Sequence, residues 1–115
     1  MMIDRSLNAS NEHRGLRTIT LSEILETLQS HRHTLEAMGV TRIGVFGSFA
    51  RGSNHSDSDI DILIGHRPGF TLFDWSRVSD YLESVFGREA DVIEIESALQ
   101  RPYFKRVVDE AIYVY

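Results

Sequence analysis

Apolar side chains recur at the spacing of a helix in two stretches of the chain. Each stretch begins with a capping box, at Thr20 and at Thr71, and each ends at a glycine, Gly39 or Gly87. Pro102 suits the first turn of a further helix. The pattern predicts that the helix beginning at Thr71 buries one stripe of side chains: Leu72, Trp75, Val78, Leu82, Val85 and Phe86.

Four shorter apolar runs are typical of strands. They cover residues 42–46, 59–64, 91–95 and 112–115. The first two are joined by a link from Gly47 to Ser58, which is too short for an ordinary helical crossover between parallel strands. The pattern therefore predicts an α/β (α+β) fold in which helices pack on one small mixed sheet of about four strands.

The length of 115 residues has room for one domain with a single core. Residues 1–18 show no sustained period, so we expect an N-terminal arm followed by one domain over residues 19–115. No apolar run approaches the roughly 20 residues that cross a bilayer, and no basic and apolar leader begins the chain. We therefore expect a cytoplasmic protein that makes no membrane contact.

Composition limits the chemistry that the chain can carry. It has no cysteine, so a metal ion would have to bind oxygen or imidazole ligands, which favours hard cations such as Mg²⁺. The net charge of -5 argues against a surface that follows an extended nucleic acid, because such surfaces carry clustered basic residues. A single nucleotide held through metal ions is the better expectation.

Two aspartates are the strongest candidates for a metal site. Asp59 and Asp61 are separated by one residue in a predicted strand, so both carboxylates should project from the same face. Two like charges held so close are unfavourable unless a cation neutralises them. Taken alone, however, the segment from Ser56 to Asp59 could equally form a solvated turn.

A second candidate lies where the first predicted strand ends. Gly47 and Ser48 precede a short helical turn, so backbone N–H groups and the Ser48 hydroxyl could face an anion. By itself, this pair indicates only the start of a helix. Arg51 follows Ser48 by one helical turn and is a further candidate for phosphate contact, although an exposed arginine is the commoner explanation.

The combined spacing resembles the signature of the polymerase-β-type nucleotidyltransferase superfamily: Gly47-Ser48, ten intervening residues, then Asp59-Ile60-Asp61. A further carboxylate on a later strand completes that signature, and Asp91 stands about where the resemblance requires it. In size, the chain is similar to the minimal nucleotidyltransferases (MNT). These MntA-like antitoxins are the partners of helical HEPN proteins in prokaryotic toxin–antitoxin pairs.

The resemblance implies a nucleotidyltransferase fold and a role for each matched residue. Asp59 and Asp61 would bind two Mg²⁺ ions, with Mn²⁺ as an alternative, and Asp91 would complete one metal site and help to activate the acceptor hydroxyl. Gly47 and Ser48 would meet the charge of the departing pyrophosphate. The implied reaction transfers AMP from ATP to a tyrosine hydroxyl of a HEPN-family toxin partner.

Two other functions stay open at this point. The chain could neutralise its partner by binding alone, with nucleotide as a structural ligand. It could also transfer a nucleotide to a small molecule or to an RNA hydroxyl, although the acidic balance weighs against RNA. In the larger transferases a further domain holds the acceptor, and we expect another molecule to present it here.

Overall fold

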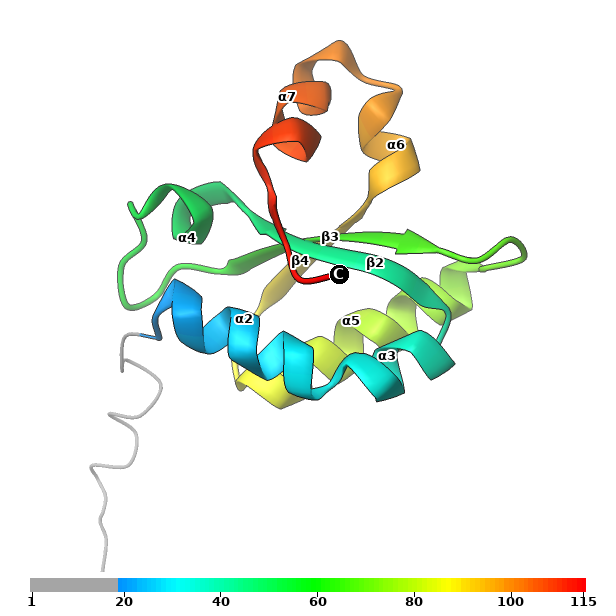
Figure 1. The fold of residues 1–115 in the computed structure, drawn as a ribbon, viewed down its shortest axis with the longest axis horizontal. Helices are drawn as coiled ribbons and strands as arrows, with labels where there is room; N and C mark the ends of the chain where they lie inside the picture. The colour runs from blue at the N-terminus through cyan, green and yellow to red at the C-terminus, as the bar shows by residue number, and fades with distance from the viewer. Residues whose placement is uncertain (1–18) are drawn as a thin grey trace, which may run out of the picture.

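The computed structural model describes residues 19–115, so the predicted arm over residues 1–18 lies outside the described part. The strands are β2 (Val40–Phe46), β3 (Ile60–His66), β4 (Ala90–Glu94) and β5 (Ile112–Tyr113). They form one four-stranded sheet in the order β4-β3-β2-β5 (Figure 1). β2 pairs antiparallel with both β3 and β5, whereas β3 and β4 run parallel. The predicted mixed sheet of about four strands is confirmed.

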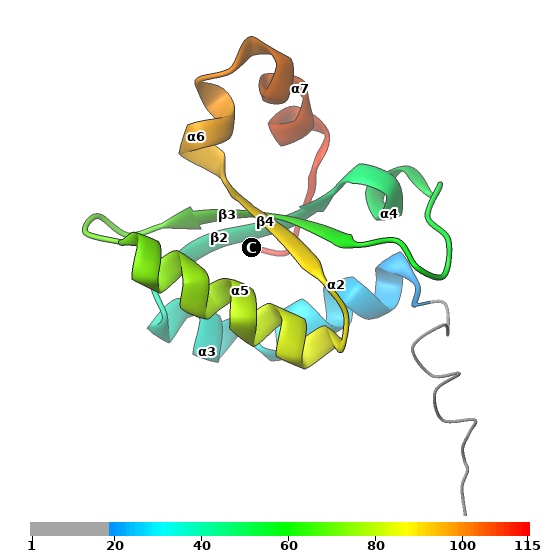
Figure 2. The same ribbon diagram turned by 180° about the vertical axis from the view of Figure 1, so that it is seen from behind.

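The helices are α2 (Leu21–Ser30), α3 (Arg32–Ala37), α4 (Gly47–Arg51), α5 (Leu72–Phe86), α6 (Ile95–Leu99) and α7 (Pro102–Glu110). α2, α3 and α5 cover one face of the sheet, and α6 and α7 stand on the other face (Figures 1 and 2). The short helix α4 joins β2 to the loop that precedes β3. Within the described residues, no helix is long and apolar enough to cross a membrane.

Strand β3 is buried on both of its faces. Ile60, Ile62 and Ile64 are fully buried in the core that α2, α3 and α5 form with the sheet. Leu63 is fully buried in a second cluster with side chains from α6 and α7. Because strand side chains alternate, Asp61 shares the face of Leu63. The apolar positions of β3 therefore anchor the strand that carries this aspartate.

The helix predicted over residues 20–39 divides in two at His31. This residue has φ −101° and ψ 7°, outside regular helical geometry. Its ring nitrogen Nδ1 lies 2.5 Å from the hydroxyl oxygen of Tyr81 on α5. The break coincides with a contact between elements distant in sequence, which local periodicity does not reveal. The predicted helix end at Gly39 is close to the observed end of α3 at Ala37.

Three further details differ from the prediction. β3 begins at Ile60, so Asp59 lies immediately before the strand rather than in it. Ile95 begins helix α6 instead of ending β4. This helix was not predicted, because five residues are too few to show a helical period in the sequence. Leu72, predicted to be buried, is 81% exposed. It is the first residue of α5, at the helix end, where no neighbouring side chain covers it.

The capping box predicted at the start of α5 is present. The Thr71 Oγ1 atom accepts a hydrogen bond from the Asp74 N–H at 3.2 Å, and Asp74 Oδ2 accepts one from the Thr71 N–H at 2.8 Å.

Thr71→Ala removes the first bond, so we expect it to lower the free energy of unfolding by about 1 kcal/mol. Thermal or urea unfolding measures this loss. Ser84→Ala, at an exposed position inside α5, is the control and should not lower stability, because alanine has the higher helix propensity. Equal midpoints for both variants would contradict the role of the cap.

Candidate active site

The turn from β2 into α4 packs directly on Asp61. Phe46, the last residue of β2, is the register partner of Asp61 on β3. Gly47 follows with φ +72°, a backbone conformation that is unfavourable for residues with a Cβ atom. A Cβ atom at Gly47 would overlap the Asp61 carboxylate and would lie 2.9 Å from its Cγ atom. Both the backbone angle and the lack of space therefore require glycine at this position.

The sheet brings the three predicted aspartates to one end. Asp61 and Asp91 are register partners on the parallel strands β3 and β4. Asp59 lies two residues before Asp61, on the approach to β3. Asp59 and Asp91 are exposed, and Asp61 is half-buried between them and the Gly47 turn. The register of β3 and β4 therefore brings Asp91 next to the Asp59–Asp61 segment at one end of the sheet.

The electrostatics of Asp61 reflect this crowding. Burial, and after it the negative charges of Asp91 and Asp59, together raise the pKa of its carboxyl from 3.8 to about 6. The positive charge of Arg51 opposes this shift. The charges of Asp59, Asp91 and Arg51 therefore all act on the Asp61 carboxyl. In the protein without a bound cation, the Asp61 carboxylate is held in an environment that disfavours its negative charge.

This environment predicts that Asp61→Asn stabilises the protein in the absence of divalent cations. The folded-state pKa of about 6 lies above the ordinary value of 3.8. The free energy of unfolding therefore falls as the pH rises from 3.8 through 6 and the carboxyl becomes charged. Because solvent screens a partly exposed carboxylate, we expect a gain of about 1 kcal/mol at neutral pH. Near pH 3.8 the gain should disappear.

Thermal unfolding in a chelating buffer at several pH values measures this effect. Asp80→Asn makes the same charge change at an exposed position on α5 and is the control. A loss of stability at neutral pH on Asp61→Asn would contradict the electrostatic account of this carboxyl.

The other predicted binding residues lie on α4, next to the carboxylates. Ser48 is half-buried, and its carbonyl oxygen accepts a hydrogen bond from the Ser53 N–H at 2.9 Å. Arg51 is exposed at the last turn of the helix. A pocket of about 190 Å³ adjoins this region, lined by Phe46, Gly47, Ala50, Arg51, Val107 and Glu110. The geometry thus places a half-buried serine and an arginine beside three acidic side chains.

The carboxylates at this end of the sheet fit a hard divalent cation. All three acidic side chains offer carboxylate oxygens, which Mg²⁺ and Mn²⁺ prefer, and their mutual repulsion is the kind that such a cation relieves. Within residues 19–115, however, no three His, Cys, Asp or Glu side chains are arranged closely enough to enclose a metal ion. The carboxylates interact through their charges without forming a closed coordination shell.

Arg88 lies beside the site without any sequence signal. Its guanidinium Nη1 atom donates a hydrogen bond to the Ser58 carbonyl oxygen at 3.1 Å and approaches the Ser56 carbonyl oxygen at 3.4 Å. With Asp59 it lines a pocket of about 350 Å³. Contacts to backbone carbonyls depend on the path of the chain and carry no sequence motif, so residue patterns along the sequence do not reveal this contact.

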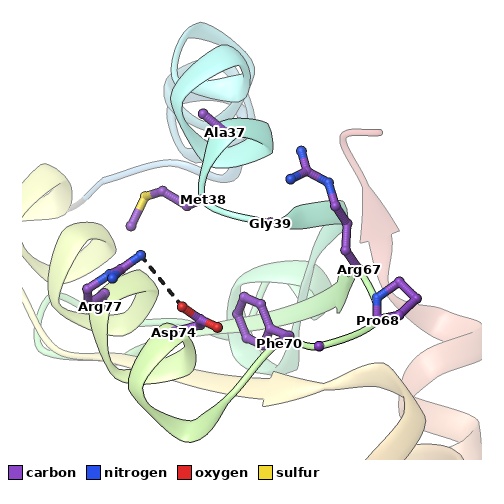
Figure 3. Close-up of a pocket in the computed structure, with 9 residues that line it drawn as sticks. Ala37, Met38, Gly39, Arg67, Pro68, Phe70, Asp74 and Arg77 are labelled. Carbon is purple, nitrogen blue, oxygen red and sulfur yellow. Dashed lines mark ion pairs between the residues drawn. The ribbon is translucent and has the colours of Figure 1, made fainter.

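Another pocket lies at the opposite end of the sheet. It has a volume of about 230 Å³ and is lined by Ala37, Met38, Gly39, Arg67, Pro68, Gly69, Phe70, Asp74 and Arg77 (Figure 3). Arg77 and Asp74 form an ion pair across 3.6 Å in its wall. None of the predicted site residues contributes to this lining. The pocket is therefore separate from the carboxylates.

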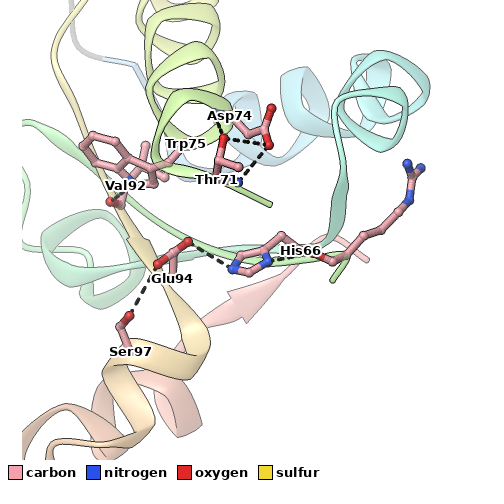
Figure 4. Close-up of polar contacts among 8 residues, drawn as sticks. His66, Thr71, Asp74, Trp75, Val92, Glu94 and Ser97 are labelled. Atoms are coloured by element: carbon pink, nitrogen blue, oxygen red, sulfur yellow. Dashed lines mark hydrogen bonds and ion pairs between the residues drawn. The ribbon is translucent and has the colours of Figure 1, made fainter. Parts of the chain in front are cut away.

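Polar contacts at the same end tie β3, β4 and α5 together (Figure 4). His66 Nε2 lies 3.0 Å from Glu94 Oε2, at the last residues of β3 and β4. The Trp75 indole N–H donates to the Val92 carbonyl oxygen at 3.0 Å. These side chains satisfy one another, and we assign them to the stability of the sheet.

Comparisons with known proteins bear on the family of this chain. The family model described as a nucleotidyltransferase domain matches residues 21–114. The protein adenylyltransferase MntA of Thermococcus cleftensis is 38% identical over 97 residues, which cover 84% of this chain and 97% of that protein. A solved structure described as a minimal nucleotidyltransferase matches with a TM-score of 0.70 and 32% identity, over 82% of this chain and 95% of that chain.

A more distant structure shares the fold. It belongs to the solved complex of a tri-AMPylated HEPN toxin of Shewanella oneidensis with an MNT antitoxin, and it matches with a TM-score of 0.55. At 16% identity, over 79% of this chain and 71% of that chain, this likeness concerns the fold alone. The family model and the more similar relatives together show that this chain belongs to the nucleotidyltransferase-domain family, as one of its minimal nucleotidyltransferases.

Proposed function

We propose that this chain is an antitoxin that transfers AMP from ATP to a tyrosine hydroxyl of a HEPN-family toxin. The observation that carries the proposal is the cluster of Asp59, Asp61 and Asp91 beside the Gly47 turn. Two similar proteins support the proposed reaction and partner. One relative is named a protein adenylyltransferase. A structure that shares the fold belongs to a complex of an AMPylated HEPN toxin with an MNT antitoxin.

The three carboxylates have distinct proposed roles. Asp59 and Asp61 would hold two divalent cations, Mg²⁺ or Mn²⁺, and Asp91 would complete one of these sites. When bound, such cations neutralise phosphate charge and favour the deprotonated form of an attacking hydroxyl. The proposal draws support from the carboxylate oxygens at this end of the sheet, because hard cations prefer oxygen ligands.

The reaction is a single displacement at the α-phosphate of ATP. The tyrosine oxygen bonds to the α-phosphorus, the bond from that phosphorus to the oxygen bridging the α- and β-phosphates breaks, and pyrophosphate leaves. The hydroxyl proton departs toward Asp91. No covalent intermediate on the chain is needed, which agrees with the absence of cysteine and with carboxylates as the main reactive groups.

Residues of α4 would bind the triphosphate. The Ser48 hydroxyl and the backbone N–H groups at Gly47 and Ser48 would meet the charge of the departing pyrophosphate. Arg51 would add a positive charge on the same side, as its effect on Asp61 indicates. Together these groups oppose the charge that develops on the leaving oxygen.

The intact mass of the partner tests the proposal. A candidate HEPN-family toxin is incubated with the chain, ATP and Mg²⁺, and we expect its mass to increase by one or more AMP units. Peptide mapping should place each unit on a tyrosine, and replacing that tyrosine with phenylalanine should abolish the increase. A partner that is inhibited but unmodified would contradict the proposal and favour neutralisation by binding alone.

A further inference from the structure

Arg88 connects the two segments that carry the outer carboxylates of the site. It follows Gly87, which ends α5 with φ +65°, and it precedes β4, which carries Asp91. Its guanidinium reaches across to the backbone just before Asp59. One side chain therefore bridges the approach to β3 and the approach to β4.

The end of the bridge on the β4 side is fixed by the fold. The Ala90 N–H donates to Glu83 Oε2 on α5 at 3.2 Å, and the Ile60 N–H donates to the Glu89 carbonyl oxygen at 3.2 Å. These bonds flank Arg88 on its C-terminal side and set the start of β4 against both α5 and β3. The guanidinium is half-buried and extends from an anchored backbone.

The other end of the bridge is a loop that lacks regular structure. Ser58 is almost fully buried, and its Oγ atom accepts a hydrogen bond from the His55 N–H at 2.9 Å. The Ser58 N–H donates in turn to the His55 carbonyl oxygen at 3.0 Å. These bonds close the loop on itself. The hydrogen bonds from Arg88 attach the carbonyl groups of this loop to the segment that leads into β4.

We propose that Arg88 is a positioning residue that holds Asp59 in place for cation binding. The bond to the Ser58 carbonyl oxygen fixes the peptide that leads directly into Asp59, and the same Nη1 atom makes a longer contact with the Ser56 carbonyl oxygen. A guanidinium presents several donors in a rigid plane, whereas an ammonium group is a point donor on a flexible stem. Both contacts come from Nη1, whose two N–H groups have fixed directions in that plane, so arginine holds the two carbonyl oxygens in a more defined geometry than lysine does.

The inference rests on the proposed function, because only a cation site gives the position of Asp59 its importance. Groups that orient the ligands of a metal typically change metal affinity by about tenfold to a hundredfold when they are removed. We expect Arg88→Met to weaken Mn²⁺ binding by that factor. Arg88→Lys should weaken it in the same direction by a smaller factor, because lysine keeps the charge and loses the planar donors.

Two measurements on the full chain without nucleotide or partner test this. Mn²⁺ titration followed by electron paramagnetic resonance gives the cation affinity, and amide hydrogen exchange in chelating buffer reports the order of the loop. Arg88→Met should raise the exchange rates of the His55 and Ser58 amides by about tenfold and leave those of β2 unchanged. Arg77→Met is the matched control, because Arg77 is an exposed residue of α5 that lines the pocket at the far end of the sheet.

The outcomes separate this inference from the proposed function. Weaker Mn²⁺ binding together with faster loop exchange supports the positioning role, even if no HEPN protein accepts AMP. Wild-type affinity and wild-type exchange in Arg88→Met would overturn it. If Arg88→Met fails to fold, Arg88→Lys decides the question, and wild-type values for that variant would overturn the requirement for the guanidinium.

Discussion

Replacing either Asp59 or Asp61 with asparagine is expected to lower the rate of AMP transfer by about a thousandfold or more. Each substitution keeps the size of the side chain and removes one negative charge from the proposed cation site. Charge stabilisation by a bound cation contributes several kcal/mol to such reactions, and each 1.36 kcal/mol corresponds to about a tenfold change in rate. The loss should appear in the rate at saturating ATP.

The two variants should differ in stability, which separates chemistry from folding. Asp61→Asn should unfold at a higher temperature than the wild type without divalent cations, because the Asp61 carboxyl has its pKa raised to about 6 by burial and by neighbouring carboxylates. Asp59 is exposed, and its charge is the smaller of the two carboxylate effects on Asp61, so Asp59→Asn should raise the unfolding temperature by less than Asp61→Asn does. Asp80→Asn serves as the control for both measurements. Transfer at the wild-type rate in either variant would contradict the proposed site.

Gly47→Ala is expected to reduce both stability and transfer strongly. The new Cβ atom would overlap the Asp61 carboxylate, and the residue would retain an unfavourable φ of +72°. We expect a loss of about 3 kcal/mol in the free energy of unfolding, which combines backbone strain with overpacking. Displacing Asp61 by about 1 Å would lower transfer by about a hundredfold.

Gly52→Ala provides a matched control for this prediction. Gly52 ends the same short helix with φ +78°, yet a Cβ atom there would meet nothing within 4 Å. It should therefore show only the backbone strain, about 1 kcal/mol, and nearly normal transfer. Unfolding midpoints and initial rates of AMP transfer measure both variants. Equal losses in the two variants would show that the contact with Asp61 has no special importance.

The sequence predicted those parts of the fold that depend on local signals. Both capping boxes, the end of α5 at Gly87 and the start of α7 at Pro102 follow from neighbouring residues, and the structure contains them. The short link between β2 and β3 correctly indicated a mixed sheet. The break at His31 was not predictable in this way, because it involves Tyr81, far along the chain.

The site was predictable to different depths. The proximity of Asp59 and Asp61 follows from their spacing in an extended segment. That of Asp61 and Asp91 depends on the register of two parallel strands, which the sequence does not fix and only family resemblance suggested. The need for glycine at position 47 comes from the Asp61 side chain packed beneath it, a contact between elements. Arg88 acts on backbone carbonyls, so no residue pattern identifies it. The roles of these residues in binding cations and nucleotide stay predictions.

The position of the transferred phosphorus tests the central claim most directly. Two parallel incubations contain the chain, its HEPN partner and Mg²⁺, with ATP labelled at the α-phosphate in one and at the γ-phosphate in the other. Nucleotidyl transfer predicts label on the partner from the α-labelled ATP alone, with the γ-label released in pyrophosphate. Label on the partner from γ-labelled ATP, or from neither, would contradict the account.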